Sequence, residues 1–116
     1  MNSIRDLLNS GKTAIGTAGS AFGDMAMLAD TGFDFLLFDT QHTPVEIKQL
    51  NLAIQAMKDK KAKPIVRVSA NREDLICFAL DVGAMGIVVP MINTREEAEA
   101  MVRACKYSPD GDRSHA

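Results

Sequence analysis

Short, wholly apolar segments alternate along this chain with longer amphipathic stretches, and this alternation constrains the fold more than any other feature. Residues 35–38 read Phe-Leu-Leu-Phe and residues 87–89 read Ile-Val-Val. Strands that are apolar at every position are typical of a sheet covered on both faces. Amphipathic stretches of helical length between such strands predict βαβ units around a parallel sheet. A solvated antiparallel sheet is disfavoured, because its strands would alternate apolar and polar residues.

The pattern predicts four strands and five helices. We expect strands at Ala14–Ala18, Phe35–Phe38, Pro64–Val68 and Gly86–Val89. We expect helices at Ser3–Asn9, Asp24–Asp30, Pro44–Lys60, Glu73–Val82 and Arg95–Tyr107. Four βα units amount to half of a (β/α)₈ barrel, which normally needs ~250 residues. The expected fold class is therefore α/β: residues 1–116 form one partial domain, the N-terminal (β/α)₄ half of a TIM barrel, with parallel strands and an N-terminal helix.

Glycines and threonines mark the expected helix ends. Gly11, Gly32 and Gly83 stand where a left-handed residue after a helix is expected. Thr43 and Thr94 stand where N-caps are expected, and each is followed three residues later by a glutamate. This spacing predicts two capping boxes, with Pro44 at the first position of its helix.

Composition and charge exclude several classes of function. The formal net charge is −2, so no basic field is available to hold a phosphate backbone, and nucleic acid is not an expected partner. No apolar run is long enough for a membrane span. The first twelve residues mix charged with apolar side chains and do not resemble a secretory signal, so we expect a cytoplasmic protein. Cys77 and Cys105 lack C-x-x-C spacing and are expected to be reduced thiols.

Polar side chains follow two of the expected strands at the point where each strand ends. Asp39, Gln41 and His42 follow the second strand, and Arg67 lies at the end of the third. In parallel α/β folds, ligands bind at the carboxyl ends of the strands. We therefore expect an acid, an imidazole and a guanidinium group to meet on one rim of the sheet.

Each of these side chains suits a distinct chemical role. Histidine is the side chain most often used to move protons in enzymes, so His42 is a candidate acid–base residue, with Asp39 placed to orient its ring. Arg67 offers a planar fork of donors that suits a carboxylate. Two structural alternatives stay open at this point: His42 only decorates a loop, or Arg67 forms a structural ion pair with Asp39 or Asp81.

The segment Gly32–Asp39, followed by Gln41-His42-Thr43-Pro44, resembles the HpcH/HpaI aldolase family, whose members carry a similar Gly-Phe-Asp segment that leads to an Asp-x-Glu-His motif. Further family-like segments follow in order along essentially the whole chain: Pro64–Val68, Leu80–Ala84, Val89–Met91, Glu96–Ala98 and Tyr107–Arg113. Gln41 departs from the pattern, because the family usually has glutamate there.

The resemblance implies a barrel enzyme that cleaves or forms 4-hydroxy-2-oxo acids, with pyruvate and an aldehyde as the small-molecule partners and a divalent metal such as Mg²⁺ or Mn²⁺. It implies that His42 is the acid–base residue, that Asp39 assists it, and that Arg67 holds the pyruvate enolate. We place Gln41 with Arg67 among the substrate-binding residues. A homo-oligomer is also expected, because half of a barrel leaves sheet edges unpaired.

The resemblance implies as well that the metal ligands are a glutamate and an aspartate on later strands. The sequence ends before either appears, so we expect no metal ligand in this chain and a truncated family member. A second hypothesis is a catalytically silent half-barrel that serves as a self-associating or binding module. A third, an enzyme acting on acyl-CoA thioesters, fits the Asp39–His42 pattern less well. Metal-dependent pyruvate release separates the first two.

Overall fold

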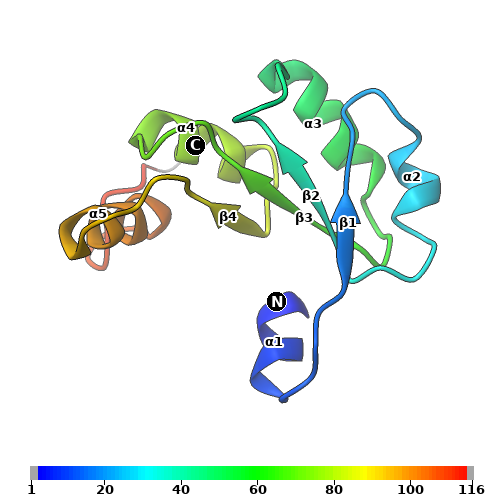
Figure 1. Ribbon diagram of the computed structural model, residues 1–116, viewed down its shortest axis with the longest axis horizontal. Coiled ribbons are helices and arrows are strands. Elements are labelled where there is room, and N and C mark those ends of the chain that lie inside the picture. The colour runs from blue at the N-terminus through cyan, green and yellow to red at the C-terminus, as the bar shows by residue number, and fades with distance from the viewer. Residues whose placement is uncertain (1–2, 115–116) are drawn as a thin grey trace.

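The sheet of this protein is wholly parallel (Figure 1). The structure, a computed structural model, describes residues 3–114. Its strands lie side by side in chain order: β1 (Gly16–Ala18), β2 (Phe35–Asp39), β3 (Lys63–Arg67) and β4 (Gly86–Val88). A helix precedes β1 and one follows each strand: α1 (Ser3–Asn9), α2 (Met25–Leu28), α3 (Ile47–Ala56), α4 (Glu73–Asp81) and α5 (Arg95–Cys105). The predicted α/β class, with parallel strands and an N-terminal helix, is confirmed.

One face of the sheet packs against the helices and forms the core. Along β2 and β3, buried and half-buried side chains alternate, so that Leu36 and Val66 lie on the covered face. These two side chains and Ile76 of α4 are the largest fully buried ones. Met25 of α2 and Leu50 of α3 belong to the same cluster. The sheet and its helices thus share a single core between two layers.

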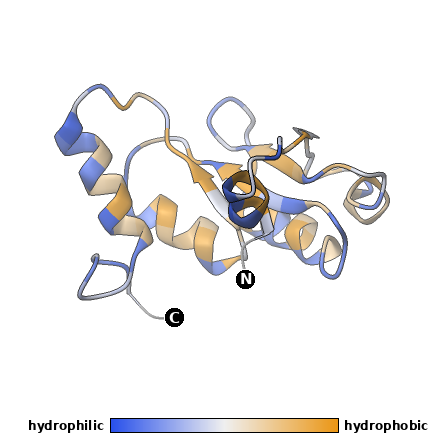
Figure 2. Ribbon diagram, turned by 90° about the horizontal axis from the view of Figure 1, so that it is seen from below, coloured by the Kyte–Doolittle hydropathy of each residue, from blue (hydrophilic) through white to orange (hydrophobic). Residues whose placement is uncertain are grey.

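The opposite face of the sheet, which we call the open face, has no helix of residues 3–114 packed flat against it (Figure 1). It comprises the alternate positions of the strands: Phe35, Leu37, Asp39, Ile65, Arg67 and Val88. Val88 is 42% exposed. Figure 2 shows the apolar character that the strands keep.

The ends of the helices follow the predicted signals in part. Gly11, Gly32 and Gly83 have positive φ angles of 81°, 116° and 112°, as expected of residues just past a helix. Thr94 is the N-cap of α5, and its hydroxyl oxygen accepts a hydrogen bond from the Glu97 N–H at 3.1 Å. Among residues 3–114, no helix has both the length and the apolar character of a membrane span.

The predicted start of the long helix at Pro44 is wrong. Helix α3 begins at Ile47, and Glu46 is its N-cap with an extended backbone. The Gln49 side chain accepts a hydrogen bond from the Glu46 N–H at 2.9 Å. Glu46 therefore serves as the N-cap in place of Thr43, and the residues from Thr43 to Val45 belong to the loop. Helix α1 has the predicted bounds, β2 extends one residue further than predicted, to Asp39, and β3 lies one residue earlier than predicted. The other expected elements are shorter than predicted at one or both ends.

Candidate active site

Asp39 and Arg67 are the last residues of β2 and β3, and the strand register places them opposite each other. Both lie on the open face at the carboxyl end of the sheet. Parallel pairing requires this meeting, because residues in register on neighbouring strands point to the same face. The structure thus brings together two of the side chains that the sequence placed on one rim.

The two side chains form a bidentate ion pair. Arg67 donates from Nε to Asp39 Oδ1 at 3.0 Å and from Nη2 to Asp39 Oδ2 at 2.5 Å. The Arg67 side chain is 32% exposed and the Asp39 side chain 26%. These hydrogen bonds from Arg67 hold the pKa of the Asp39 carboxyl group well below its ordinary value, against the opposing effect of desolvation. The same pair raises the pKa of Arg67.

The loop after β2 is fastened to this ion pair through its backbone. Asp39 Oδ1 also accepts hydrogen bonds from the N–H groups of Gln41 at 2.8 Å and His42 at 3.3 Å. Thr40 donates both its N–H, at 2.9 Å, and its hydroxyl, at 2.7 Å, to the carbonyl oxygen of Arg67. The first residues of the loop are therefore fixed relative to the ends of both strands.

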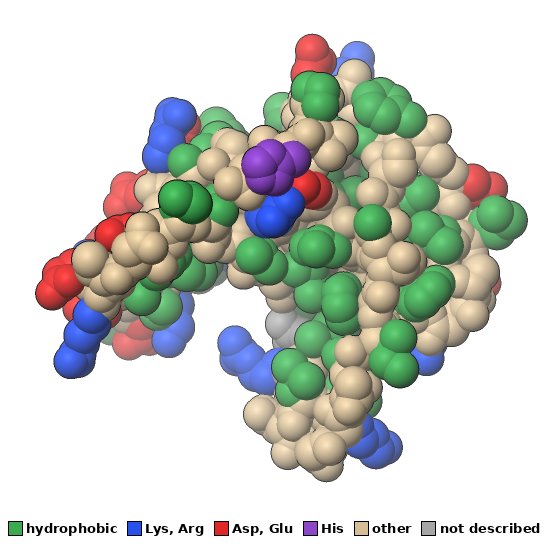
Figure 3. Space-filling model, viewed as in Figure 1, with side chains coloured by type: hydrophobic (Ala, Val, Ile, Leu, Met, Phe, Trp, Pro, Cys, Tyr) green, Lys and Arg blue, Asp and Glu red, His purple; other side chains and the backbone are tan. Residues whose placement is uncertain are grey.

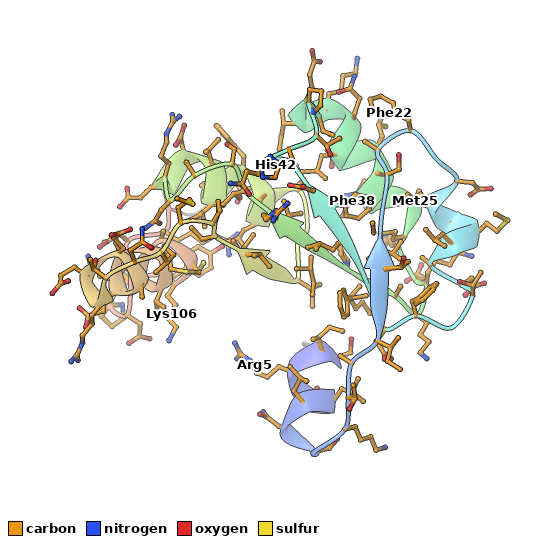
Figure 4. All side chains as sticks on the ribbon, in the orientation of Figure 1. Arg5, Phe22, Met25, Phe38, His42 and Lys106 are labelled. Atoms are coloured by element: carbon orange, nitrogen blue, oxygen red, sulfur yellow. The ribbon has the colours of Figure 1, made fainter. Side chains whose placement is uncertain are left out.

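His42 stands exposed on this fixed loop, beside the charged pair (Figures 3 and 4). Among the hydrogen bonds described for residues 3–114, those of the Asp39 carboxylate go to Arg67 and to backbone N–H groups. The alternative of an Arg67–Asp39 ion pair is thus what the structure contains, while Asp81 pairs with Arg113 at 3.3 Å. The orientation of the His42 ring by Asp39 stays a prediction.

A pocket of about 380 Å³ opens beside the pair, between the loop after β1 and the loop after β2. Its lining includes Asp39, Thr40 and Thr43 from one side and Phe22 from the other. Phe22 is 72% exposed, which is unusual for so large an apolar side chain. The motifs of the sequence analysis do not include this segment. An aromatic residue in the loop that follows a strand end was the signal that could have drawn attention to it.

The rim does not fit Mg²⁺ or Mn²⁺ by itself. Asp39 is the carboxylate at the strand ends, and both of its oxygens already accept hydrogen bonds from Arg67. Such cations are held by several oxygen ligands, and within residues 3–114 no group of three or more His, Cys, Asp or Glu side chains is close enough to hold a metal ion.

The fold and the rim together define an α/β protein of the barrel type, with an acid–base candidate and an anion-binding candidate at the carboxyl ends of its strands. Residues 18–116 match the family model described as HpcH/HpaI aldolase/citrate lyase. The chain belongs to this family, as the resemblance indicated.

Proteins of known name support the assignment. The chain is 36% identical over 115 residues to the hydroxypyruvate/pyruvate aldolase of Roseobacter denitrificans, covering 97% of this chain and 45% of that protein. It is 39% identical over 114 residues to the 4-hydroxy-2-oxo-heptane-1,7-dioate aldolase of Klebsiella pneumoniae, covering 97% and 43%. The crystal structure of a family member from Burkholderia cenocepacia matches with a TM-score of 0.88 and 30% identity, over 100% of this chain and 49% of that one. The chain spans about half the length of these relatives, which confirms half of a TIM barrel.

Proposed function

We propose that this chain forms half of the active site of a metal-dependent, class II-type aldolase, which cleaves or forms 4-hydroxy-2-oxo acids with pyruvate as one product. The observation that carries the proposal is the meeting of Arg67, Asp39 and His42 at the carboxyl ends of β2 and β3. The names of the two aldolase relatives support the choice of a 2-oxo acid and an aldehyde as partners.

In the cleavage direction, a base removes the proton of the C4 hydroxyl group of the substrate. The C3–C4 bond breaks, its electron pair moves onto C3 and the 2-oxo group as an enolate, and an aldehyde leaves. A proton delivered to C3 then completes pyruvate. We assign the proton transfer to His42, whose exposed ring lies on the rim.

Arg67 is the group we assign to the carboxylate and enolate oxygens, because its fork matches two oxygens at once. Gln41 stands next to His42 and completes the proposed substrate-binding set. The divalent cation, Mg²⁺ or Mn²⁺, belongs to the proposal through the resemblance. Residues 3–114 contain no group of three or more His, Cys, Asp or Glu side chains that could hold it, and we assign its ligands to later strands through the same resemblance.

The second candidate is a catalytically silent half-barrel that binds a partner or itself. The observation that favours it is the open face, where Val88 remains 42% exposed. A homo-oligomer in the cytoplasm is compatible with either candidate. An acyl-CoA thioester substrate remains the third and less favoured option.

Pyruvate release from a 4-hydroxy-2-oxo acid, followed by coupling to lactate dehydrogenase, tests the proposal. The assay compares Mg²⁺, Mn²⁺ and a chelator, and uses this half within a complete barrel. We expect release that depends on the metal and is lost in His42→Ala. If no pyruvate is released with either cation, in a barrel whose fold is verified by circular dichroism, the result would support the binding module instead.

A further inference from the structure

The loop after β1 holds an exposed aromatic side chain at the rim. The Phe22 N–H donates to the hydroxyl oxygen of Ser20 at 3.2 Å, and the Ser20 N–H donates to Sδ of Met25 at 3.3 Å. Met25 is a core residue with 5% exposure, so these hydrogen bonds tie the loop to the core. The Phe22 side chain nevertheless stays 72% exposed. A large apolar side chain that is held in water beside a pocket marks a binding surface.

The pocket beside Phe22 is mainly apolar. Two of the residues that line it, Phe38 and Leu50, belong to the buried core, at 3% and 2% exposure. Further apolar lining comes from Ala18, Ala21, Phe22, Leu37 and Val45. The volume of about 380 Å³ is within the range of pockets that bind small molecules. The pocket thus has the size and the surface for a small apolar group.

Charge in the pocket is of one sign. Among the described residues that line it, Asp39 is charged and none is a lysine or an arginine. Both Asp39 oxygens already accept hydrogen bonds from Arg67, and the other polar lining side chains are the hydroxyls of Ser20, Thr40 and Thr43. A carboxylate that entered this pocket would lose water, lie near the negative charge of Asp39 and find no cation. The lining therefore favours a neutral group over an anionic one.

The pocket and the proposed active site share Asp39. This residue lines the pocket and is paired with Arg67, to which the proposed function assigns the substrate carboxylate. Phe22 lies on the loop after β1 and His42 on the loop after β2 (Figure 4). A substrate held at Arg67, with its reacting carbons near His42, can therefore extend past Asp39 into the pocket. The part that extends is the chain beyond C4, which leaves as the aldehyde.

We propose that Phe22 and its pocket bind the aldehyde portion of the substrate and make the enzyme selective for aldehydes with a neutral, apolar chain over aldehydes that carry a carboxylate. This inference rests on the proposed function, since it takes an aldol reaction of pyruvate as the chemistry. Phe22 is then a specificity-determining residue, supplied by the loop after β1. It takes no part in the transfer of the proton.

Condensation of pyruvate with butanal and with succinic semialdehyde tests this selectivity, because both aldehydes have a four-carbon chain and only the second carries a carboxylate. The assay measures kcat/KM for each aldehyde in a complete barrel that contains this half, with Mg²⁺ or Mn²⁺. We expect the wild type to favour butanal. Phe22→Ala should lower this preference about tenfold, as is typical when apolar contact in a binding pocket is lost. Phe22→Arg, which adds a cation to the pocket, should reverse the preference.

Phe78→Ala is the matched control, because Phe78 is 54% exposed on α4 and does not line this pocket. It should leave the ratio of the two kcat/KM values unchanged. A wild type that favours succinic semialdehyde would overturn the inference, and so would a ratio that stays the same in both Phe22 variants.

Exchange of the pyruvate methyl protons for deuterium separates this inference from the proposed function, because the exchange needs no aldehyde. A wild-type barrel that exchanges these protons, but whose aldehyde preference does not depend on residue 22, would count against the inference alone. A wild-type barrel without exchange would overturn the proposed function and this inference with it.

Discussion

At the scale of single residues, four N–H donors from three residues converge on the Asp39 carboxylate at the end of β2. The sequence placed Asp39 and Arg67 at strand ends, because the apolar runs that precede them are clear. Their pairing depends on the register of β2 and β3, which sets Asp39 opposite Arg67 and which no sequence pattern specifies. Phe22 could not be predicted for the same reason. It lines the same pocket as Asp39 because two loops that are separate in the sequence lie on either side of that pocket.

The Asp39 carboxylate should make the free energy of unfolding depend on pH in the acid range. Its pKa is held well below the ordinary value of 3.8, so its contribution is fully present above that pH and is lost as the pH falls toward the folded-state pKa. The difference in unfolding free energy between wild type and Asp39→Asn should therefore shrink below about pH 4. Urea unfolding at several pH values measures it, with Asp30→Asn as control. A difference that is constant with pH would show that the ion pair does not stabilise the folded chain.

Substitution of Arg67 and substitution of His42 should change different kinetic parameters in an active barrel. Arg67→Ala removes a charge-assisted clamp worth roughly 1.5–3 kcal/mol, so KM should rise, and kcat should fall if the clamp tightens on the enolate. Arg67→Lys should recover only part of the loss, because an ammonium group lacks the fork. His42→Ala should lower kcat with little change in KM. Steady-state pyruvate release distinguishes the two patterns, and identical patterns would contradict the separate roles.

At the scale of elements, the helix starts show what local signals can and cannot predict. Thr94 and Thr43 carry the same threonine-to-glutamate spacing, yet only Thr94 caps a helix. At the second site Gln49 offers an equivalent box three residues later, and Glu46 uses it. Two overlapping N-cap signals, Thr43 with Glu46 and Glu46 with Gln49, are present there. Because the second one is used, the loop between Asp39 and the helix is longer than predicted. The existence of each helix was predictable from periodicity, whereas this boundary was not.

The two threonines form a matched pair for a stability test. Thr94→Ala removes the acceptor for the Glu97 N–H, and loss of such a cap costs about 1 kcal/mol. Thr43→Ala removes no cap, so its effect should stay within about 0.5 kcal/mol. Chemical denaturation of both variants measures the difference. Equal losses would contradict the helix start at Ile47.

At the scale of the whole molecule, the main feature is the open face, where apolar side chains of the sheet are not covered by a helix of residues 3–114. Phe35 and Leu37 of β2 and Ile65 of β3 face the open side, while the helices of residues 3–114 pack against the other face. The sequence indicated half of a barrel because it contains four βα units, and a complete barrel has eight. The apolar content of a strand shows that a face will be buried and does not show by which residues.

The 116-residue chain by itself should associate. The open face offers apolar side chains, and β1 and β4 leave edges that no described strand pairs. Light scattering should find dimers or larger species. Val88→Lys places a charge on the edge strand β4 and should shift the distribution toward monomer. A stable monomer of the wild-type chain would contradict the exposed half-barrel.

The chain alone should bind divalent metal weakly, because residues 3–114 contain no group of three or more His, Cys, Asp or Glu side chains that could hold the ion. Calorimetry with Mn²⁺ should detect no tight site. Micromolar binding that disappears in Asp39→Asn would show instead that this half builds its own metal centre.

Exchange of the pyruvate methyl protons for deuterium, followed by NMR in the presence of Mg²⁺ or Mn²⁺, tests the central claim most directly. It reports proton transfer at C3 and needs no knowledge of the aldehyde. In a complete barrel that contains this half, we predict exchange that falls by about 10²–10⁴-fold in His42→Ala. Exchange at the wild-type rate in His42→Ala would contradict the assignment of His42 as the residue that moves the proton.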